Sequence, residues 1–325
     1  MATSQLQYDP EYLAVVSAVD RPASVPFKDV WELRAFTDPL LRHFIHSQPA
    51  PEDVVATRIP FVSHDGAEVA LYRFATKEMT EAAEPQPAVV YAHGGGMVAG
   101  NVDIFAPQIK RFVAAAGRPF FAVDYRLAPE FPGGLGAEDV YHGLRHLSEH
   151  AAEWNVDAAR IVIMGDSAGG GIAAGAAIIA RDRGLSPPLR KQVLVYPMLD
   201  DRTVLAEDSA VYPLLTWKAG DNLLAWRAVL GDKAGDPAAE GISLYAAPGR
   251  AGVEDLRGLP STYIDVGSLD LFRDECIEYA AKLAKADVEV EFHLWPGLPH
   301  GFESALPVSW VKKALEARNS AVNRV

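Results

Sequence analysis

The sequence of 325 residues is 49% hydrophobic and 22% charged, which is the usage of an ordinary globular protein with a substantial core. Acidic residues outnumber basic ones by 43 to 30, and the formal net charge of −13 argues against nucleic acid or an anionic membrane surface as a partner. The single cysteine excludes an internal disulfide bond.

The N-terminal region, residues 1–50, mixes apolar and polar positions and contains Pro22, Pro26, Pro39 and Pro49. This pattern predicts short helices interrupted by proline turns. Acidic residues near the start argue against a secretory signal, and no apolar stretch is long enough to span a bilayer. We therefore expect a cytoplasmic protein.

Strands and helices alternate through the rest of the chain. Two strands joined by a turn at Asp65-Gly66 are expected first, at residues 59–63 and 68–74. Further strands are expected at 88–92, 120–124, 161–164, 192–196, 262–266 and 288–294, and helices at 103–117, 137–150, 167–183, 272–286 and 308–318. This alternation predicts an α/β fold with a mostly parallel central sheet flanked by helices.

Residues 200–249 interrupt the alternation. They place Trp217, Trp226 and several leucines at helical spacing without a clear strand. We expect a helical insertion that forms a cap, together with residues 1–50, over the edge of the sheet where ligands bind in such folds. Residues 51–199 and 250–325 would then form the catalytic core.

The segment Gly165-Asp166-Ser167-Ala168-Gly169 fits the G-x-S-x-G pattern of a nucleophile elbow. An expected strand precedes it and an expected helix follows it, which is the context that this pattern requires. The glycines permit a sharp turn that lifts the serine hydroxyl above the sheet edge, and the helix N-terminus favours developing negative charge. We predict that Ser167 is a nucleophile.

His93-Gly94-Gly95-Gly96 follows the strand expected at 88–92. Successive glycines let backbone N–H groups approach a substrate oxygen, so this loop and the N–H of Ala168 are predicted to form an oxyanion hole. A phosphate-binding loop is the weaker interpretation, because neither a G-x-x-x-x-G-K nor a G-x-G-x-x-G pattern fits here.

A histidine after the serine should be the general base, because this kind of fold orders its triad as serine, acid and histidine. His293 lies within the last expected strand, whereas His300 lies in the loop beyond it, which favours His300. The predicted acid is Asp270, in the loop after the preceding strand, where it would orient the histidine. Asp274 is the runner-up, and Asp265 is expected within a strand.

These motifs together resemble the hormone-sensitive-lipase family of esterases over roughly residues 87–302. Tyr125-Arg126-Leu127-Ala128-Pro129-Glu130 and His300-Gly301-Phe302 complete the match, the former as a structural motif that braces the site. The resemblance implies an α/β-hydrolase fold with a cap and a catalytic triad. The implied triad is Ser167, Asp270 and His300, and the implied oxyanion donors are Gly94, Gly95 and Ala168.

The acid segment departs from the family pattern Asp-Pro-Leu-Arg-Asp-Glu-Gly. Leu271 stands in place of the proline and Cys276 in place of the glycine. Neither departure removes a catalytic group.

The predicted activity is hydrolysis of short- to medium-chain carboxylic esters through an acyl-enzyme intermediate, without a metal or an organic cofactor. The same triad also serves lactones, amides and carbamates, so these remain alternatives. A non-catalytic receptor for a small ligand on the same scaffold is another alternative, which the retention of His300 disfavours. An interfacial lipase is disfavoured by the acidic chain.

Three features carry further predictions. His142, His146 and His150 recur at a metal-compatible spacing on an expected helix, but a solvated or half-buried helix face is the preferred interpretation. Trp217 and Trp226 either line an acyl pocket, where Trp217 would bind substrate, or pack the cap. The alternating strand at 288–294 is expected at a sheet edge, which predicts a homodimer formed through this strand.

Overall fold

The computed structural model describes residues 6–17 and 26–325, so Pro22 lies outside the described residues. These residues form one eight-stranded sheet in the order β1-β2-β4-β3-β5-β6-β7-β8. The strands are β1 (Val55–Val62), β2 (Glu68–Ala75), β3 (Gln86–Ala92), β4 (Phe120–Asp124), β5 (Val156–Asp166), β6 (Lys191–Val195), β7 (Ser261–Gly267) and β8 (Val290–Trp295). β2 is antiparallel to both of its neighbours, and every other pair is parallel.

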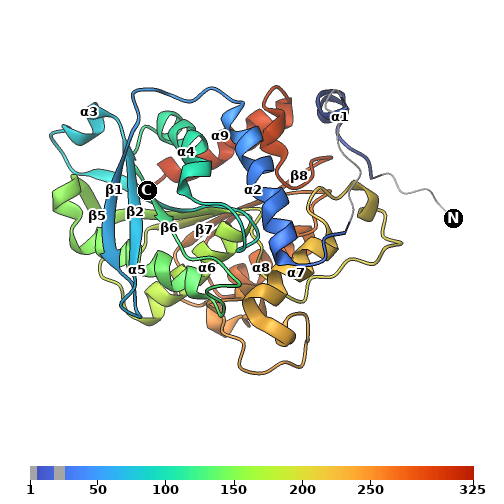
Figure 1. Ribbon diagram of the computed structural model, residues 1–325. Coiled ribbons are helices and arrows are strands. Elements are labelled where there is room, and N and C mark those ends of the chain that lie inside the picture. The colour runs from blue at the N-terminus through green and yellow to red at the C-terminus, as the bar shows by residue number, and fades with distance from the viewer. Residues whose placement is uncertain (1–5, 18–25) are drawn as a thin grey trace.

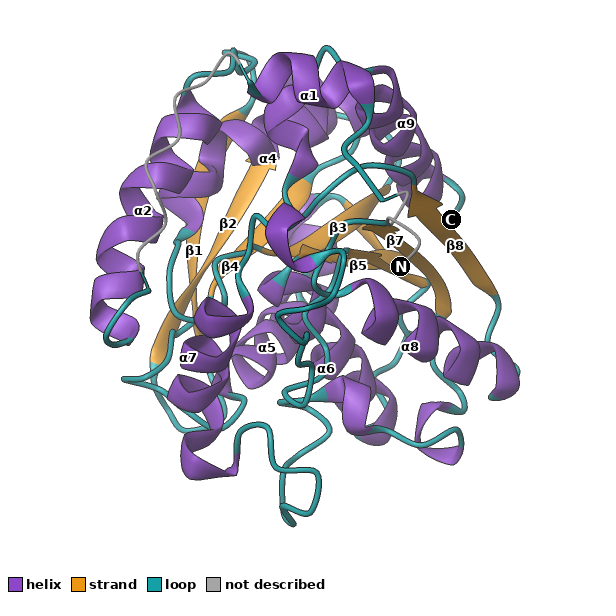
Figure 2. Ribbon diagram, turned by 90° about the vertical axis from the view of Figure 1, so that its right-hand side faces the viewer, coloured by secondary structure: helices purple, strands orange, loops and turns teal. Residues whose placement is uncertain are grey.

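Helices cover both faces of the sheet (Figures 1 and 2). α4 (Val102–Ala116) and α9 (Ser309–Asn323) lie on one face, and α5 (Leu135–Glu149), α6 (Ala168–Asp182) and α8 (Arg273–Lys285) lie on the other. The other α-helices of the described ranges are α1 (Pro10–Val16), α2 (Val30–His46), α3 (Lys77–Thr80) and α7 (Ala219–Leu230). This arrangement confirms the predicted α/β fold class. Within the described ranges, every helix is too short or too polar to cross a bilayer.

Close packing of α6 against the sheet positions the turn that precedes it. β3 and β5 are buried along apolar runs, as strands covered on both faces require. A Cβ atom on Gly169 would lie only 2.1 Å from the carbonyl oxygen of Ala92, so a glycine is needed for this approach. The start of α6 therefore lies directly against the end of β3.

α2 is longer than the short helices predicted for the N-terminal region, because it continues through Pro39. Proline removes one backbone N–H donor from a helix interior. Asp29 offsets this loss by capping the N-terminus, where its side chain accepts two hydrogen bonds of 2.9 Å from first-turn N–H groups. Leu33 and Ile45 are buried on either side of the proline, so packing sustains the helix across it.

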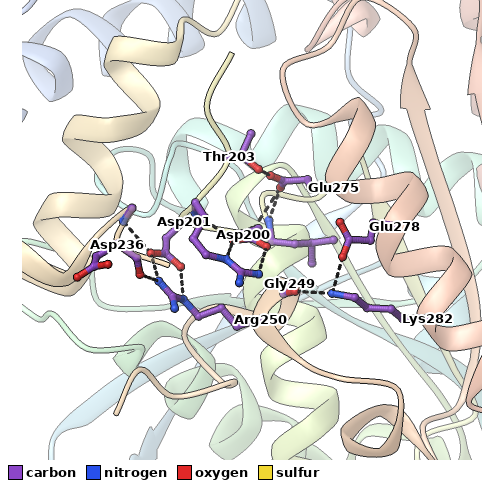
Figure 3. Close-up of polar contacts among 12 residues, drawn as sticks. Asp200, Asp201, Thr203, Asp236, Gly249, Arg250, Glu275, Glu278 and Lys282 are labelled. Carbon is purple, nitrogen blue, oxygen red and sulfur yellow. Dashed lines mark hydrogen bonds and ion pairs between the residues drawn. The ribbon is translucent and has the colours of Figure 1, made fainter. Parts of the chain in front are cut away.

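Residues 200–249 contain α7 and several single-turn helices, and buried polar contacts hold the ends of this segment together (Figure 3). Arg250 donates two hydrogen bonds, of 2.6 and 2.8 Å, to the carboxylate of Asp201. Glu275, on α8, accepts hydrogen bonds from the N–H of Leu199 at 2.6 Å and from the hydroxyl of Thr203. The segment thus leaves the core and returns to it at neighbouring points.

Candidate active site

Ser167 lies in the turn between β5 and α6, with backbone angles φ 58° and ψ −122°. A positive φ is unfavourable for a residue with a side chain and persists only where surrounding contacts impose it. Here the N–H of Ser167 donates to the carbonyl of Val195 at 2.9 Å, and its own carbonyl accepts from the N–H groups of Gly170 and Met198, also at 2.9 Å. These bonds hold the serine side chain at the carboxyl edge of the parallel strands.

The imidazole of His300, in the loop after β8, lies between Ser167 and Asp270. Its Nε2 is 2.9 Å from Ser167 Oγ, and its Nδ1 is 2.8 Å from Asp270 Oδ2. Asp270 is only 2% exposed, and its second oxygen accepts a hydrogen bond from the N–H of Phe272 at 2.9 Å. The structure thus brings the three predicted residues together, in the geometry that lets an imidazole take the proton of a serine hydroxyl.

The alternative residues considered for the base and the acid have other partners. His293 Nε2 lies 2.9 Å from Glu291 Oε1. Asp265 is fully buried and accepts a hydrogen bond from Arg318 at 2.7 Å. The side chain of Asp274 is 71% exposed on the surface. The contact with Ser167 therefore favours His300 as the base, and the contact with His300 favours Asp270 as the acid.

The loop after β3 passes beside the serine. A Cβ atom on Gly94 would lie 2.9 Å from Asp166 Oδ2 and 3.5 Å from Ser167 Cβ, so a side chain here would collide with the elbow. His93 anchors the loop: its ring stacks on Tyr125 with centroids 4.3 Å apart, and the Tyr125 hydroxyl donates to the His93 carbonyl at 2.7 Å. Burial lowers the pKa of His93, which favours the neutral imidazole.

Gly94, Gly95 and Ala168 are the predicted oxyanion donors. Ala168 is the first residue of α6, and N–H groups in the first turn of a helix have no partner within the helix. The N–H of Ser167 itself is already bonded to a carbonyl. Gly95, with φ 119°, continues the loop, and its carbonyl accepts from Ala99 at 2.9 Å. Ala168 follows Ser167 directly in the chain, and Gly94 packs against Ser167, so both backbone segments lie next to the serine residue.

A cavity of about 860 Å³ opens at the serine, with walls from α2, α4, α9 and residues 215–218. Trp217 lies over the glycine loop, because a Cβ atom on Gly96 would be 2.9 Å from its ring. The hydroxyl of Thr216 donates to the carbonyl of His300 at 2.7 Å. The 215–218 stretch therefore both lines the cavity and holds the histidine loop.

Asp166, the variable residue before the serine, was given no role by the sequence. It is 6% exposed and accepts a hydrogen bond from the hydroxyl of Tyr91. Burial raises its pKa from an ordinary value of 3.8 to about 6. A variable position within a motif carries no chemical signal of its own, so only the structure reveals this buried carboxyl.

A buried polar cluster packs behind His300 and was also missed. The ring of Tyr196 lies 4.5 Å from the imidazole, centroid to centroid, and its hydroxyl donates to Glu303 at 2.8 Å. Arg318 bridges Glu303 and Asp265. The position of Tyr196 just after β6 was a signal that could have indicated it, whereas Arg318 reaches the cluster only through the packing of α9.

In the histidine row at α5, His142 is buried, whereas His146 and His150 are half-buried as expected. Among the described residues, His64, Glu138 and His142 bring possible metal-ligand atoms within 4.8 Å of one another. However, both carboxylate oxygens of Glu138 accept hydrogen bonds from Arg183, at 2.6 and 2.9 Å. A cation would have to displace this guanidinium, so the donor set does not fit a metal site.

Comparisons with known proteins agree with this geometry. Residues 89–304 match a protein family whose description is "alpha/beta hydrolase fold". The chain is 39% identical over 235 residues to esterase LipI of Mycobacterium tuberculosis, covering 72% of this chain and 70% of that protein. It is 40% identical over 218 residues to carboxylesterase NlhH of the same species, covering 66% of each chain. Among solved structures, a bacterial heroin esterase matches with a TM-score of 0.86 at 32% identity, over 98% of both chains.

The fold and the serine–histidine–aspartate arrangement define a serine hydrolase of the α/β-hydrolase class. The chain belongs to the α/β-hydrolase family that its residues 89–304 match, and its resemblance to the hormone-sensitive-lipase-like esterases is confirmed.

Proposed function

We propose that this protein is a serine carboxylesterase in which Ser167 is the nucleophile, His300 the general base and Asp270 the residue that orients the base. The observation that carries the proposal is the continuous line of contacts, 2.9 Å from Ser167 Oγ to His300 and 2.8 Å from His300 to Asp270. Both mycobacterial relatives are named as esterases, and small-molecule esters are the corresponding substrates.

The reaction follows from these positions. His300 Nε2 takes the hydroxyl proton while Ser167 Oγ forms a bond to the ester carbonyl carbon. The N–H groups of Gly94, Gly95 and Ala168 stabilise the negative oxygen of the tetrahedral intermediate. The carbon–oxygen bond to the alcohol then breaks, and His300 donates the proton to the leaving alkoxide. Water repeats the sequence on the acyl-serine and releases the acid.

We further propose that residues 1–50 and 200–249 act as a cap and that Trp217 contacts the substrate. Support comes from the cavity, whose walls include residues of α2 on one side and residues 215–218 on the other. Trp217 lies against Gly96, next to the proposed oxyanion donors. A substrate acyl group bound at the serine would then lie beside the indole ring.

The direct test is hydrolysis of p-nitrophenyl acetate and butyrate by the wild type and by Ser167→Ala and His300→Ala. We expect either substitution to lower kcat by about 10⁴-fold or more. His293→Ala serves as the matched control and should retain wild-type activity, since that histidine pairs with Glu291. Wild-type rates in Ser167→Ala would refute the proposal. Mass spectrometry after rapid quenching should find an acyl group on Ser167.

The proposed homodimer rests on β8, which is the last strand in the sheet order and exposes Leu294 by 43%. An edge strand of this kind is able to pair with its own copy. Light scattering at micromolar concentration should give twice the monomer mass, and a single monomer mass would exclude the dimer. The cytoplasmic location predicted from the sequence also stays a proposal, which cell fractionation tests.

A further inference from the structure

The cavity at the serine continues far beyond the triad. Its walls descend between α4 and α9, which lie side by side on one face of the sheet (Figures 1 and 2). The far part, here called the α4–α9 channel, is lined by Phe112, Ala115, Ala116, Phe120, Leu315 and Val322. A short ester occupies only the region around Ser167. Hydrolysis of such an ester therefore does not account for the α4–α9 channel.

The strand register gives the separation of Phe120 and Ser167 along the sheet. Phe120 pairs with Val89, which in turn pairs with Val162 on β5, the strand that leads to Ser167. From Val162 to Ser167 the strand advances about 16 Å, at roughly 3.3 Å per residue. An extended alkyl chain with bonds of about 1.5 Å covers that distance with roughly a dozen carbons.

The chemistry of the walls selects the occupant. Two polar groups near the far end are bonded to the protein itself: Asn319 Nδ2 donates to the carbonyl of Ala115 at 2.8 Å, and Arg118 donates to the carbonyl of Asn323 at 3.0 Å. These contacts join the C-terminal ends of α4 and α9. The lining along the two helices is mostly aromatic and aliphatic, and its polar members are Gln108, Arg111, Arg318 and Asn319. A mostly apolar space that extends away from the proposed nucleophile suits an unbranched aliphatic chain.

Resting on the proposed esterase activity, we infer that the α4–α9 channel binds an aliphatic chain of about eight to twelve carbons, so that the preferred substrates are esters with one such chain. Chains of this length lie at or beyond the upper end of the short- to medium-chain range predicted from the sequence. Each methylene that enters the channel is removed from water, which stabilises the bound chain. If the chain stays in the channel in the transition state, this stabilisation raises kcat/KM.

The test uses two ester series at concentrations below aggregation, p-nitrophenyl esters from acetyl to palmitoyl and acetates of unbranched alcohols from ethanol to dodecanol. Wild-type kcat/KM should rise at least tenfold from the shortest chain to the optimum in one series. A rise in the first series places the acyl chain in the channel, and a rise in the second places the alcohol chain there.

Blocking variants locate the chain. Ala116→Phe, at the far end, should lower kcat/KM for the longest chains about tenfold or more and leave acetate hydrolysis within twofold of the wild type. Leu315 lies one turn of α9, about 6 Å, nearer the serine than Asn319. Leu315→Trp should therefore begin to reduce activity at chains about five carbons shorter than those that Ala116→Phe affects. Ala114→Phe is the matched control, because Ala114 is exposed on the same helix and lies outside the lining.

Identical chain-length profiles for the wild type, Ala116→Phe and Leu315→Trp would overturn the inference. Wild-type activity that falls once the varied chain exceeds about four carbons, in both series, would also overturn it. Acetate hydrolysis reports the folding and chemistry of every variant. Absence of wild-type hydrolysis for every ester of both series would instead refute the proposed esterase itself, so the two failures are distinguishable.

Discussion

The guanidinium of Arg34, on α2, donates two hydrogen bonds to the carboxylate of Glu130, at 2.6 and 2.7 Å. It also donates to the carbonyl of Ala128 at 2.7 Å and to the carbonyl of Val98. The Arg34 guanidinium lowers the pKa of Glu130 to about 2. One side chain thus joins the N-terminal helix to the segment that follows the glycine loop and to the motif that begins at Tyr125.

Replacing Arg34 with alanine should therefore disturb the glycine loop without touching the triad. We expect kcat/KM for p-nitrophenyl acetate to fall about tenfold, because small displacements of oxyanion donors have large effects on rate. Arg42→Ala is the control: Arg42 also lies on α2, but its ion pair with Asp103 is exposed, 48% and 78% for the two side chains. Equal rates for the two variants would contradict the proposed link.

The Asp270→Asn variant should fold like the wild type but have a much lower kcat. An amide in place of the carboxylate no longer stabilises the imidazolium that forms as His300 takes the proton, and a loss of about 10⁴-fold in kcat is expected. Asp274→Asn should have little effect, since that side chain is 71% exposed. Stopped-flow hydrolysis of p-nitrophenyl acetate measures both. An Asp270→Asn enzyme within tenfold of the wild type would remove Asp270 from the triad.

The buried carboxyl of Asp166 should make stability depend on pH. Its pKa is raised from 3.8 to about 6, so between these values the folded protein holds a proton that the unfolded chain releases. This contribution to stability is present below about pH 4 and is lost as the pH rises through 6, an effect on the order of 3 kcal/mol. Asp166→Asn should therefore match the wild type at pH 4 and exceed its free energy of unfolding at pH 8.

Urea unfolding at both pH values measures this difference. Tyr91→Phe is a useful companion, because the Tyr91 hydroxyl donates to the carboxylate and lowers its pKa. Loss of this hydroxyl should lower the free energy of unfolding at pH 8 below that of the wild type. Parallel stability curves for the wild type and Asp166→Asn from pH 4 to 8 would show that Asp166 does not titrate in this range.

The ion pair between Arg250 and Asp201 should matter more for stability than its surface counterparts. The two side chains are 9% and 0% exposed, so Arg250→Ala would leave a buried carboxylate without its charged partner. We expect a loss of about 3–5 kcal/mol in the free energy of unfolding. Arg202→Ala, which breaks the neighbouring and more exposed pair with Asp200, should lose about 1 kcal/mol. Equal losses in urea unfolding would argue against a special role for the buried pair.

The fold was predictable because its parallel strands are mostly apolar along their buried length. β3, β5 and β7 stand out for this reason, and the motifs at their ends follow from their positions. β1 was placed too late in the sequence: it begins at Val55, but its first four residues are exposed and show no apolar alternation. Those residues are in a strand because they pair with β2, which a local pattern does not reveal.

The proximity of Ser167, His300 and Asp270 was predictable because each follows the carboxyl end of a parallel strand. The loops after such strands lie at the same edge of the sheet. The channel was not, because it depends on how α4 and α9 dock against each other. Contacts such as that between Asn319 and Ala115 join residues far apart in sequence and leave no mark in local composition. The same holds for Asp166 and Arg318, whose burial is a property of the assembled core.

The order of these elements along the chain has a consequence for synthesis. The glycine loop and the elbow precede His300 along the chain, and Ser167 and His300 are 133 residues apart. A chain still being made on the ribosome therefore contains the proposed nucleophile before the histidine proposed to activate it. Under the proposed mechanism, a chain that ends before His300 has the serine without its base, and we expect it to leave the esters around it intact.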